Sequence, residues 1–326
     1  MKKITITDEY AGQRLDKYLK RLLPSCPGSL LYKQLRKKNI TLNGSKADGS
    51  ESVREGDTVE VFFSDETFDK FSQGEKQNTS RFENAYRSLG RIDVVTEKDD
   101  FIIFNKPAGI LSQGDNSGAY SINDYLIGYL LEKGDITEES LNTVKPSVCN
   151  RLDRNTSGLI ICSKNLKGAR FINTYFHNRD VNKYYLALCC GRFDQEGERT
   201  AFVRKDEKEN RLLFTTDADS GAMEIRNGFE VIESTDDLSL LKIHLYTGKS
   251  HQIRAHLSHM GFPIIGDSKY GGNNGKYRVK RQMLHAYSLQ LTGDSRYKDM
   301  TFTAPMPTDM LSICRKEFGP NPELKI

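Results

Sequence analysis

Apolar positions near the N-terminus follow the spacing of a helix. In residues 14–23, five apolar side chains occupy positions i, i+3, i+4, i+7 and i+8: Leu15, Tyr18, Leu19, Leu22 and Leu23. This spacing predicts an amphipathic helix, which Pro24 ends. A second helix is predicted over residues 29–38, with Ser29 as its N-terminal cap and Leu31 and Leu35 on one face.

Short β elements follow these two helices. Ile40–Leu42 is predicted to be a strand that ends in the turn Asn43-Gly44, a dipeptide that favours tight hairpins. Residues 59–62 predict another strand, directly after the Gly56-Asp57 turn. The pattern indicates a small module of two helices and a few short strands.

Residues 64–90 separate this module from the rest of the chain. The stretch is polar and shows no sustained period, so we interpret it as an irregular linker. The chain then divides into a small domain over 1–63, the linker over 64–90 and a larger domain over 91–326. About two domains are expected for 326 residues.

Strand patterns dominate the larger domain. Apolar runs predict strands at residues 94–95, 101–104, 159–162, 184–188 and 238–245. Helical patterns occur near residues 122–132, 165–178 and 251–260. Because strands and helices do not alternate strictly, we predict an α+β fold with a mixed sheet rather than a doubly wound fold.

The composition is that of a globular protein. Apolar residues make up 37% of the chain, and no run approaches the roughly 18 consecutive apolar residues that a membrane helix needs. The N-terminus alternates polar and apolar residues and has no apolar signal-peptide core. The six cysteines show no C-x-x-C spacing, so we expect free thiols, no zinc site and a location in the cytoplasm.

The formal net charge of +4 is distributed unevenly. Residues 1–62 contain 12 basic and 8 acidic residues, whereas the rest of the chain contains 36 of each. From Arg14 to Lys46 there are nine basic residues and one acid, Asp16. This balance favours a polyanionic partner for the small domain. We expect five of these side chains to contact the partner: Arg14, Lys17, Lys33, Arg36 and Lys37.

Three stretches of the larger domain carry polar side chains suited to chemistry. NRLDRNTSGL (150–159) places Asp153 on a loop before an apolar strand, although an ordinary Asx turn would look the same. TGKSHQIRAHL (247–257) places Arg254 on the first turn of a helix, where it could pair with a loop carboxylate or face solvent. KYYLA (183–187) places two tyrosines on opposite faces of a strand. Either one of them faces a cleft, or both are ordinary packing residues. The histidines of the second stretch lack an acidic companion, so no metal site is expected.

Together these stretches resemble the RluA-type pseudouridine synthases. Three further motifs add to the likeness and follow the family's order over about residues 90–326: NKPAGI (105–110), GDSKYGG (266–272) and LHA (284–286). The resemblance implies that the mixed sheet of the larger domain is largely antiparallel.

The small domain resembles an S4 RNA-binding domain. The likeness rests on RLDKYL (14–19), LYKQLRKKNITLNG (31–44) and EGDTV (55–59). An S4 domain ahead of an RluA-type catalytic domain is the layout of bacterial enzymes that modify large-subunit ribosomal RNA. The resemblance therefore implies that the polyanionic partner is RNA.

The resemblance assigns roles to three residues. The family's catalytic aspartate falls on Asp153, its active-site tyrosine on Tyr185, and the arginine that pairs with the aspartate on Arg254. Two positions depart from the family pattern. Asn150 stands where many members carry His, and Ser112-Gln113 stands where many carry Val-His. An Asn at position 150 still donates and accepts hydrogen bonds.

The implied reaction breaks the N1–C1′ bond of uridine, turns the base and rejoins it through C5. It includes no redox step, so we expect no cofactor and no metal. Asp153 would attack C1′ or remove a proton from C2′, and the sequence does not choose between them. Tyr185 would close over the base and transfer a proton, while Arg254 would keep Asp153 ionised. A flipped uridine needs a basic cleft, and three residues are candidates for its lining: Arg151, Arg154 and Lys249.

The expected substrate is 23S ribosomal RNA, bound by a monomer without a nucleotide cofactor or a membrane. A synthase acting on tRNA is an alternative. A non-catalytic RNA-binding or ribosome-assembly factor is another, and Asn150 is its only support. A hydrolase that uses Asp153 shares the carboxylate, but it lacks a second carboxylate motif suited to acid–base work. The intact set of Asp153, Tyr185 and Arg254 favours the synthase.

Overall fold

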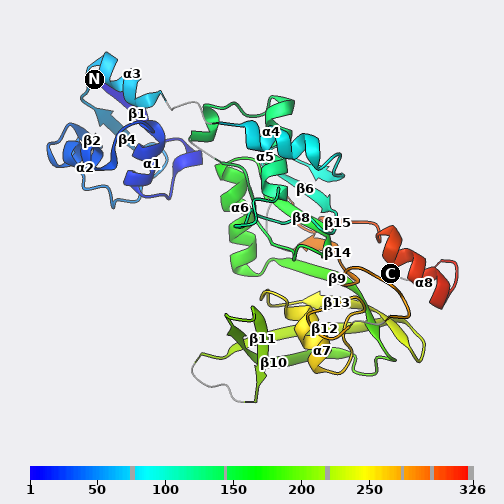
Figure 1. Cartoon of the computed structure of the whole chain (residues 1–326). Coiled ribbons are helices and arrows are strands. Elements are labelled where there is room, and N and C mark those ends of the chain that lie inside the picture. Colours follow the sequence, from blue (N-terminus) through cyan, green and yellow to red (C-terminus); the bar gives the residue numbers. More distant parts are fainter. Residues whose placement is uncertain (74–77, 143–144, 217–220, 273–274, 294–296, 322–326) are drawn as a thin grey trace.

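The computed structural model describes residues 1–73, 78–142, 145–216, 221–272, 275–293 and 297–321. Within them the chain forms two sheets, one of four strands and one of 11. Figure 1 shows the smaller sheet with its two helices at one end of the molecule and the larger sheet with the C-terminal helix at the other. The predicted α+β class is confirmed.

The small domain packs two helices on its antiparallel sheet. The helices are α1 (Leu15–Leu22) and α2 (Gly28–Arg36), close to the predicted ranges. The sheet has the order β1-β4-β2-β3, and its strands are β1 (Lys2–Thr5), β2 (Ile40–Leu42), β3 (Ser45–Lys46) and β4 (Thr58–Val61). Asn43 and Gly44 have the positive φ angles of a tight hairpin, as predicted.

One detail of α2 differs from the prediction. Ser29 lies inside the first turn, and Pro27 stands at the N-cap position without a side-chain cap. Proline has no N–H and presets φ, so it is tolerated where a helix begins.

The sequence pattern predicts an irregular linker over residues 64–90, whereas the described part of this range forms two helices. These are α3 (Asp65–Ser72), which Ser64 caps through the Thr67 amide, and α4 (Ser80–Ser88). Phe68 and Phe71 of α3 pack on the core of the small domain. The apolar residues recur at three- and four-residue intervals, but they are few among many polar residues, so the sequence shows no clear helical period.

Helix α4 packs on the larger domain instead. A Cβ at Gly128 of α5 (Ile122–Lys133) would lie 2.2 Å from the Phe82 carbonyl oxygen, so only glycine lets the two helices approach this closely. The ring of Tyr86 on α4 lies 5.4 Å from that of Tyr125 on α5. The two helices of residues 64–90 therefore each belong to the body that they cover.

The larger sheet has the order β11-β10-β12-β13-β9-β14-β8-β6-β5, with β15 paired to β14 and β7 to β8. β8 and β14 run parallel, and the other neighbours within the described residues run antiparallel. The strands are β5 (Val94–Glu97), β6 (Phe101–Lys106), β7 (Ser147–Val148), β8 (Ser157–Ser163), β9 (Val181–Cys190), β10 (Gly197–Asp206), β11 (Arg211–Thr215), β12 (Met223–Ser234), β13 (Leu238–Leu245), β14 (Leu284–Leu291) and β15 (Thr301–Thr303).

Helices cover both faces of the sheet around β6. Phe104 and Ile160 pack with α5 on one face, while Phe101 and Leu159 pack with α6 (Leu166–Asn178) on the other. This alternation explains why β6 and β8 read as continuous apolar runs. Of the helices in the described residues, none is both long and apolar enough to span a bilayer.

The two remaining α-helices of the described residues come late in the chain. α7 (Gln252–His259) packs Ile253 and Leu257 on the core of β9 and β13, and α8 (Thr308–Phe318) packs Met310 on the same core. The sequence pattern did not predict α8, nor the strands β10, β11, β12, β14 and β15. β8, β9 and α7 converge where the three polar stretches of the sequence meet.

Candidate active site

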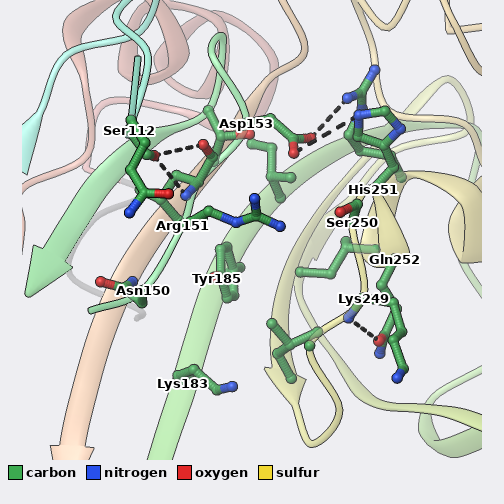
Figure 2. Close-up of a pocket in the computed structure, with 18 of the residues that line it drawn as sticks. Ser112, Asn150, Arg151, Asp153, Lys183, Tyr185, Lys249, Ser250, His251 and Gln252 are labelled. Atoms are coloured by element: carbon green, nitrogen blue, oxygen red, sulfur yellow. Dashed lines mark hydrogen bonds and ion pairs between the residues drawn. The ribbon is translucent and has the colours of Figure 1, made fainter. Parts of the chain in front are cut away.

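A pocket of about 680 Å³ opens at this convergence. Its lining residues fall between Leu111 and Leu284 and include Asp153, Tyr185 and Arg254. Figure 2 shows Asp153 and His251 facing each other across the top of the pocket and Tyr185 and Lys183 below them on one strand, β9. The fold therefore brings together the three residues that the family resemblance selected.

Asp153 and Arg254 form the central ion pair of the pocket. Arg254 Nη1 donates to Asp153 Oδ2 at 2.7 Å. Arg254 also binds Asp267 through two parallel hydrogen bonds, from Nε at 2.6 Å and from Nη2 at 2.9 Å. Burial opposes the charge on Arg254, but Asp267 and then Asp153 outweigh it and raise its pKa. The guanidinium is thus a fixed cation between two carboxylates.

Several hydrogen bonds hold the loop that carries Asp153. The Ser112 hydroxyl donates to the Leu152 carbonyl at 2.8 Å and accepts from the Leu152 amide at 2.9 Å. The Thr156 amide donates to the Asp153 carbonyl at 3.0 Å, which closes a tight turn. Ser112 is one of the family departures, and here it clamps the backbone next to Asp153.

Lys106 supports the same loop with hydrogen bonds from its side chain. Its side chain is fully buried, and Nζ donates to the carbonyls of Arg154 (3.1 Å), Pro107 (3.0 Å) and Ile110 (2.8 Å). Burial lowers the pKa of Lys106 to about 7, although the charge of Asp153 opposes this shift. Lys106 thus ties the NKPAGI segment to the loop of Asp153.

A close strand contact fixes the other end of the loop. Gly158 has φ +112°, and a Cβ there would lie 2.2 Å from the Ala286 carbonyl oxygen on β14. Ser157 Oγ and His285 Nδ1 are 2.9 Å apart, and His285 Nε2 lies 3.2 Å from the Ala304 carbonyl oxygen. Because a carbonyl only accepts, His285 carries its proton on Nε2, and burial lowers its pKa to about 4.

His251 faces Asp153 from the beginning of α7. Its backbone is left-handed, with φ 60°, and its Nε2 lies 3.9 Å from Asp153 Oδ1. Non-glycine residues adopt this conformation at an energetic cost, although histidine is among those found there more often. Burial is the main cause that lowers the pKa of His251.

Tyr185 and Tyr184 face opposite sides of β9, as the strand geometry predicts. Tyr185 lines the pocket, and burial, followed by the charge of Asp153, raises its pKa above the ordinary value of 10.0. Its hydroxyl therefore stays protonated at neutral pH. Tyr184 stacks on His244 with 4.6 Å between ring centroids.

Comparisons with known proteins identify the family. The model of the RNA pseudouridylate synthase family matches residues 100–259, and the S4 domain model matches residues 13–59. Ribosomal large subunit pseudouridine synthase C of Rickettsia bellii is 31% identical over 312 residues, which are 94% of this chain and 98% of that protein. The chain belongs to the RNA pseudouridine synthase family.

Further relatives agree with this assignment. Ribosomal large subunit pseudouridine synthase D of Borreliella burgdorferi is 31% identical over 73% of this chain and 72% of that protein. The solved structure of human RNA pseudouridylate synthase domain containing 4 covers 72% of this chain and 96% of its own, with a TM-score of 0.59 and 20% identity, and so shares the fold. The family inferred from the motifs is confirmed: the protein is an isomerase that acts on RNA.

The predicted RNA-binding residues of this synthase occupy different places. Arg151 and Lys249 line the pocket and are exposed. Arg154 lies outside the lining, because its Nε donates to the Gly109 carbonyl at 3.0 Å. The predicted residues of the S4 domain are exposed on or beside its two helices: Arg14, Lys17, Lys33, Arg36 and Lys37.

Asn150 uses its amide within the fold. Nδ2 donates to the Leu159 carbonyl at 3.3 Å, and Oδ1 accepts from the Ile161 amide at 2.8 Å. The side chain also borders the pocket. Asn150 therefore holds β8 through its amide, and this role does not need a side chain that titrates.

Sequence reasoning left several site residues without a role. Asp267 and His285 lie in motifs that support the family resemblance, yet each pairs with a residue of another motif: Asp267 binds Arg254, 13 positions away, and His285 binds Ser157, 128 positions away. An acidic residue in the glycine-rich GDSKYGG segment was the available signal. It indicates a tight turn and does not reveal which cation the turn meets.

Proposed function

We propose that this protein isomerises specific uridines of large-subunit ribosomal RNA, with Asp153 as the catalytic carboxylate. The observation that carries the proposal is the 2.7 Å pair of Asp153 and Arg254 beside Tyr185 in a pocket of about 680 Å³. The substrate class comes from the relatives whose names specify the ribosomal large subunit. The protein works in the cytoplasm as a monomer, without a cofactor.

Asp153 Oδ1 is the oxygen available for chemistry. Arg254 donates to Oδ2 at 2.7 Å, while Oδ1 lies 3.9 Å from His251 Nε2, beyond hydrogen-bond distance. An ionised oxygen held in one place can attack C1′ or take a proton from C2′, and both routes detach the base from the sugar. Fixing this atom removes the entropic cost of bringing it to the sugar.

Tyr185 then acts on the detached base. Because its pKa is raised, the phenol keeps its proton and offers a hydrogen-bond donor from the floor of the pocket. C5 of the turned base forms the new bond to C1′ as the bond between C1′ and Asp153 breaks or, on the other route, as C2′ regains its proton from Asp153. The Tyr185 phenol gives its proton to N1, and its oxygen takes up the proton that C5 releases. A protonated phenol at this position serves that exchange as a donor.

The S4 domain, over residues 1–63, supplies most of the grip on the RNA. Its helices carry exposed cations, among them Lys33, Arg36 and Lys37. Contacts with phosphates release counterions and read little sequence, so they set affinity and not the choice of uridine. Arg151 and Lys249, at the pocket, contact the strand next to the flipped nucleotide.

The substrate is tested by mapping pseudouridines in cells that lack the gene. The proposal predicts that one or more pseudouridines disappear from large-subunit ribosomal RNA and return when the gene is restored. A loss confined to tRNA would contradict the ribosomal substrate and leave the chemistry intact. An unchanged map of both RNAs would contradict the proposal as a whole.

A further inference from the structure

The GDSKYGG loop contacts both groups that face Asp153. The described lining of the pocket includes no residue of this loop. Two of its side chains nevertheless reach the site indirectly. Asp267 binds Arg254, and Tyr270 binds His251.

The carboxylate of Asp267 is fully buried and accepts hydrogen bonds from four donors. Its side chain has 0% exposure, and besides the two bonds from Arg254 its Oδ1 accepts the amides of Lys269 at 3.0 Å and Tyr270 at 3.1 Å. A buried carboxylate with all these partners cannot rotate without losing bonds. Arg254 Nε and Nη2 are therefore held by Asp267, and Nη1 is left directed at Asp153.

Tyr270 fixes the histidine on the other side of Asp153. The Tyr270 hydroxyl accepts from the Leu212 amide at 3.2 Å and lies 3.3 Å from His251 Nδ1, to which it can donate its own proton when that nitrogen carries none. Nε2 of His251 then carries the ring proton, and this is the atom that faces Asp153. The Tyr270 ring also lies 5.3 Å from Arg254 Cζ.

This arrangement keeps the catalytic carboxylate reactive. His251 is surrounded by Asp153, Arg254, Asp267, Lys269 and Tyr270, and burial lowers its pKa, so it is neutral at pH 7. Asp153 thus pairs with one full cation, which is itself shared with Asp267, and faces one neutral imidazole at 3.9 Å. A second full cation would pair with Oδ1 and reduce its reactivity.

We propose that Asp267 and Tyr270 are positioning residues for the isomerisation: Asp267 aims Arg254, and Tyr270 aims His251, at Asp153. Neither residue touches the substrate. The inference rests on the proposed role of Asp153. It predicts that losing either side-chain function lowers kcat and leaves the binding of RNA, and hence KM, nearly unchanged.

The test compares Asp267→Asn and Tyr270→Phe with Ser268→Ala, an exposed position of the same loop. The assay is release of tritium from C5 of uridine in large-subunit RNA, because C5 loses its hydrogen in the reaction. We expect kcat to fall about 100-fold in Asp267→Asn and about tenfold in Tyr270→Phe, with KM within about twofold. Ser268→Ala should match the wild type.

The pH profile separates positioning from a general structural effect. The Tyr270 hydroxyl stabilises neutral His251, so in Tyr270→Phe the acidic limb of kcat should move to higher pH. A wild-type kcat and profile in Tyr270→Phe would overturn the inference, as would a raised KM with unchanged kcat in either variant. If Asp267→Asn does not fold, Tyr270→Phe alone decides.

Asp153→Asn distinguishes this inference from the proposed function. If Asp153→Asn is inactive while Asp267→Asn and Tyr270→Phe turn over normally, the positioning role is wrong and the proposed function stands. If Asp153→Asn keeps full activity, the proposed function fails first.

Discussion

Arg254 donates a 2.7 Å hydrogen bond from Nη1 to Asp153 Oδ2, although the two residues are 101 positions apart in the chain. The same guanidinium holds Asp267 through its two other donor groups. A lysine has no planar fork and cannot bind both carboxylates in this geometry.

Arg254→Lys therefore tests the fork. We expect kcat for tritium release to fall about 100-fold, with RNA affinity within about twofold, because the side chain lies mostly beneath the surface. Arg192→Lys is the matched control, since Arg192 binds Asp236 at 2.9 Å on the exposed surface. Normal turnover in Arg254→Lys would show that a single positive charge suffices.

Tyr185→Phe tests the phenol of the pocket floor. The ring that packs in the core remains, and the hydroxyl that faces the pocket is removed. We expect kcat to fall about 100-fold, the usual size of a lost acid–base group, while the variant still binds RNA. Tyr184→Phe, on the other face of β9, should retain wild-type kcat. Equal activity of the two variants would argue against proton transfer by Tyr185.

Replacing the cations at the C-terminal end of α2 and at its C-cap, Lys37, tests the RNA grip of the S4 domain. In a triple change of Lys33, Arg36 and Lys37 to Gln, we expect weaker binding and a slope of log affinity against log salt that is smaller by about 1 for each lost phosphate contact. The activity at saturating RNA should not change. The control is Arg315→Gln with Lys316→Gln on α8, far from the S4 domain in Figure 1. An unchanged salt slope in the triple variant would contradict this role.

His285 makes stability depend on pH. Its pKa is about 4 in the folded protein, below the ordinary 6.5, so the unfolded chain binds the extra proton first. Stability from this group is complete above pH 6.5 and is lost as the pH falls toward 4, by about 3 kcal/mol in total. Chemical denaturation of wild type and His285→Gln across this range measures the difference.

The expected result is a flatter pH dependence in His285→Gln. The exposed His177→Gln on α6 controls for the substitution itself. Parallel pH curves for the wild type and His285→Gln would show that the buried imidazole is not responsible.

The sequence predicts those helices and strands that bury either one face or both faces in a core. Leu15 and Leu19 share one helix face and are fully buried, and residues 101–104 of β6 are apolar because helices cover both faces of that strand. β10, in contrast, pairs on both sides yet buries only one of its residues, Val203, so charged residues break the apolar pattern. Its strand character comes from tertiary pairing, which no local pattern records.

In the site, too, local sequence motifs predict some residues, whereas others become apparent only from the folded structure. Motifs selected Asp153, Tyr185 and Arg254, and the fold places them around one pocket. The contribution of Asp267 depends on where α7 meets the GDSKYGG loop, which is a property of the folded chain. The sequence also offered Arg154 as a lining residue, but the Gly109 carbonyl holds its side chain elsewhere.

The central claim is that Asp153 performs the isomerisation. The most direct measurement is single-turnover release of tritium from C5 of uridine in large-subunit RNA by Asp153→Asn, with binding of the same RNA measured in parallel. Our account predicts no detectable release and wild-type binding, because an amide is neither a nucleophile nor a base at neutral pH. Release at the wild-type rate would contradict it.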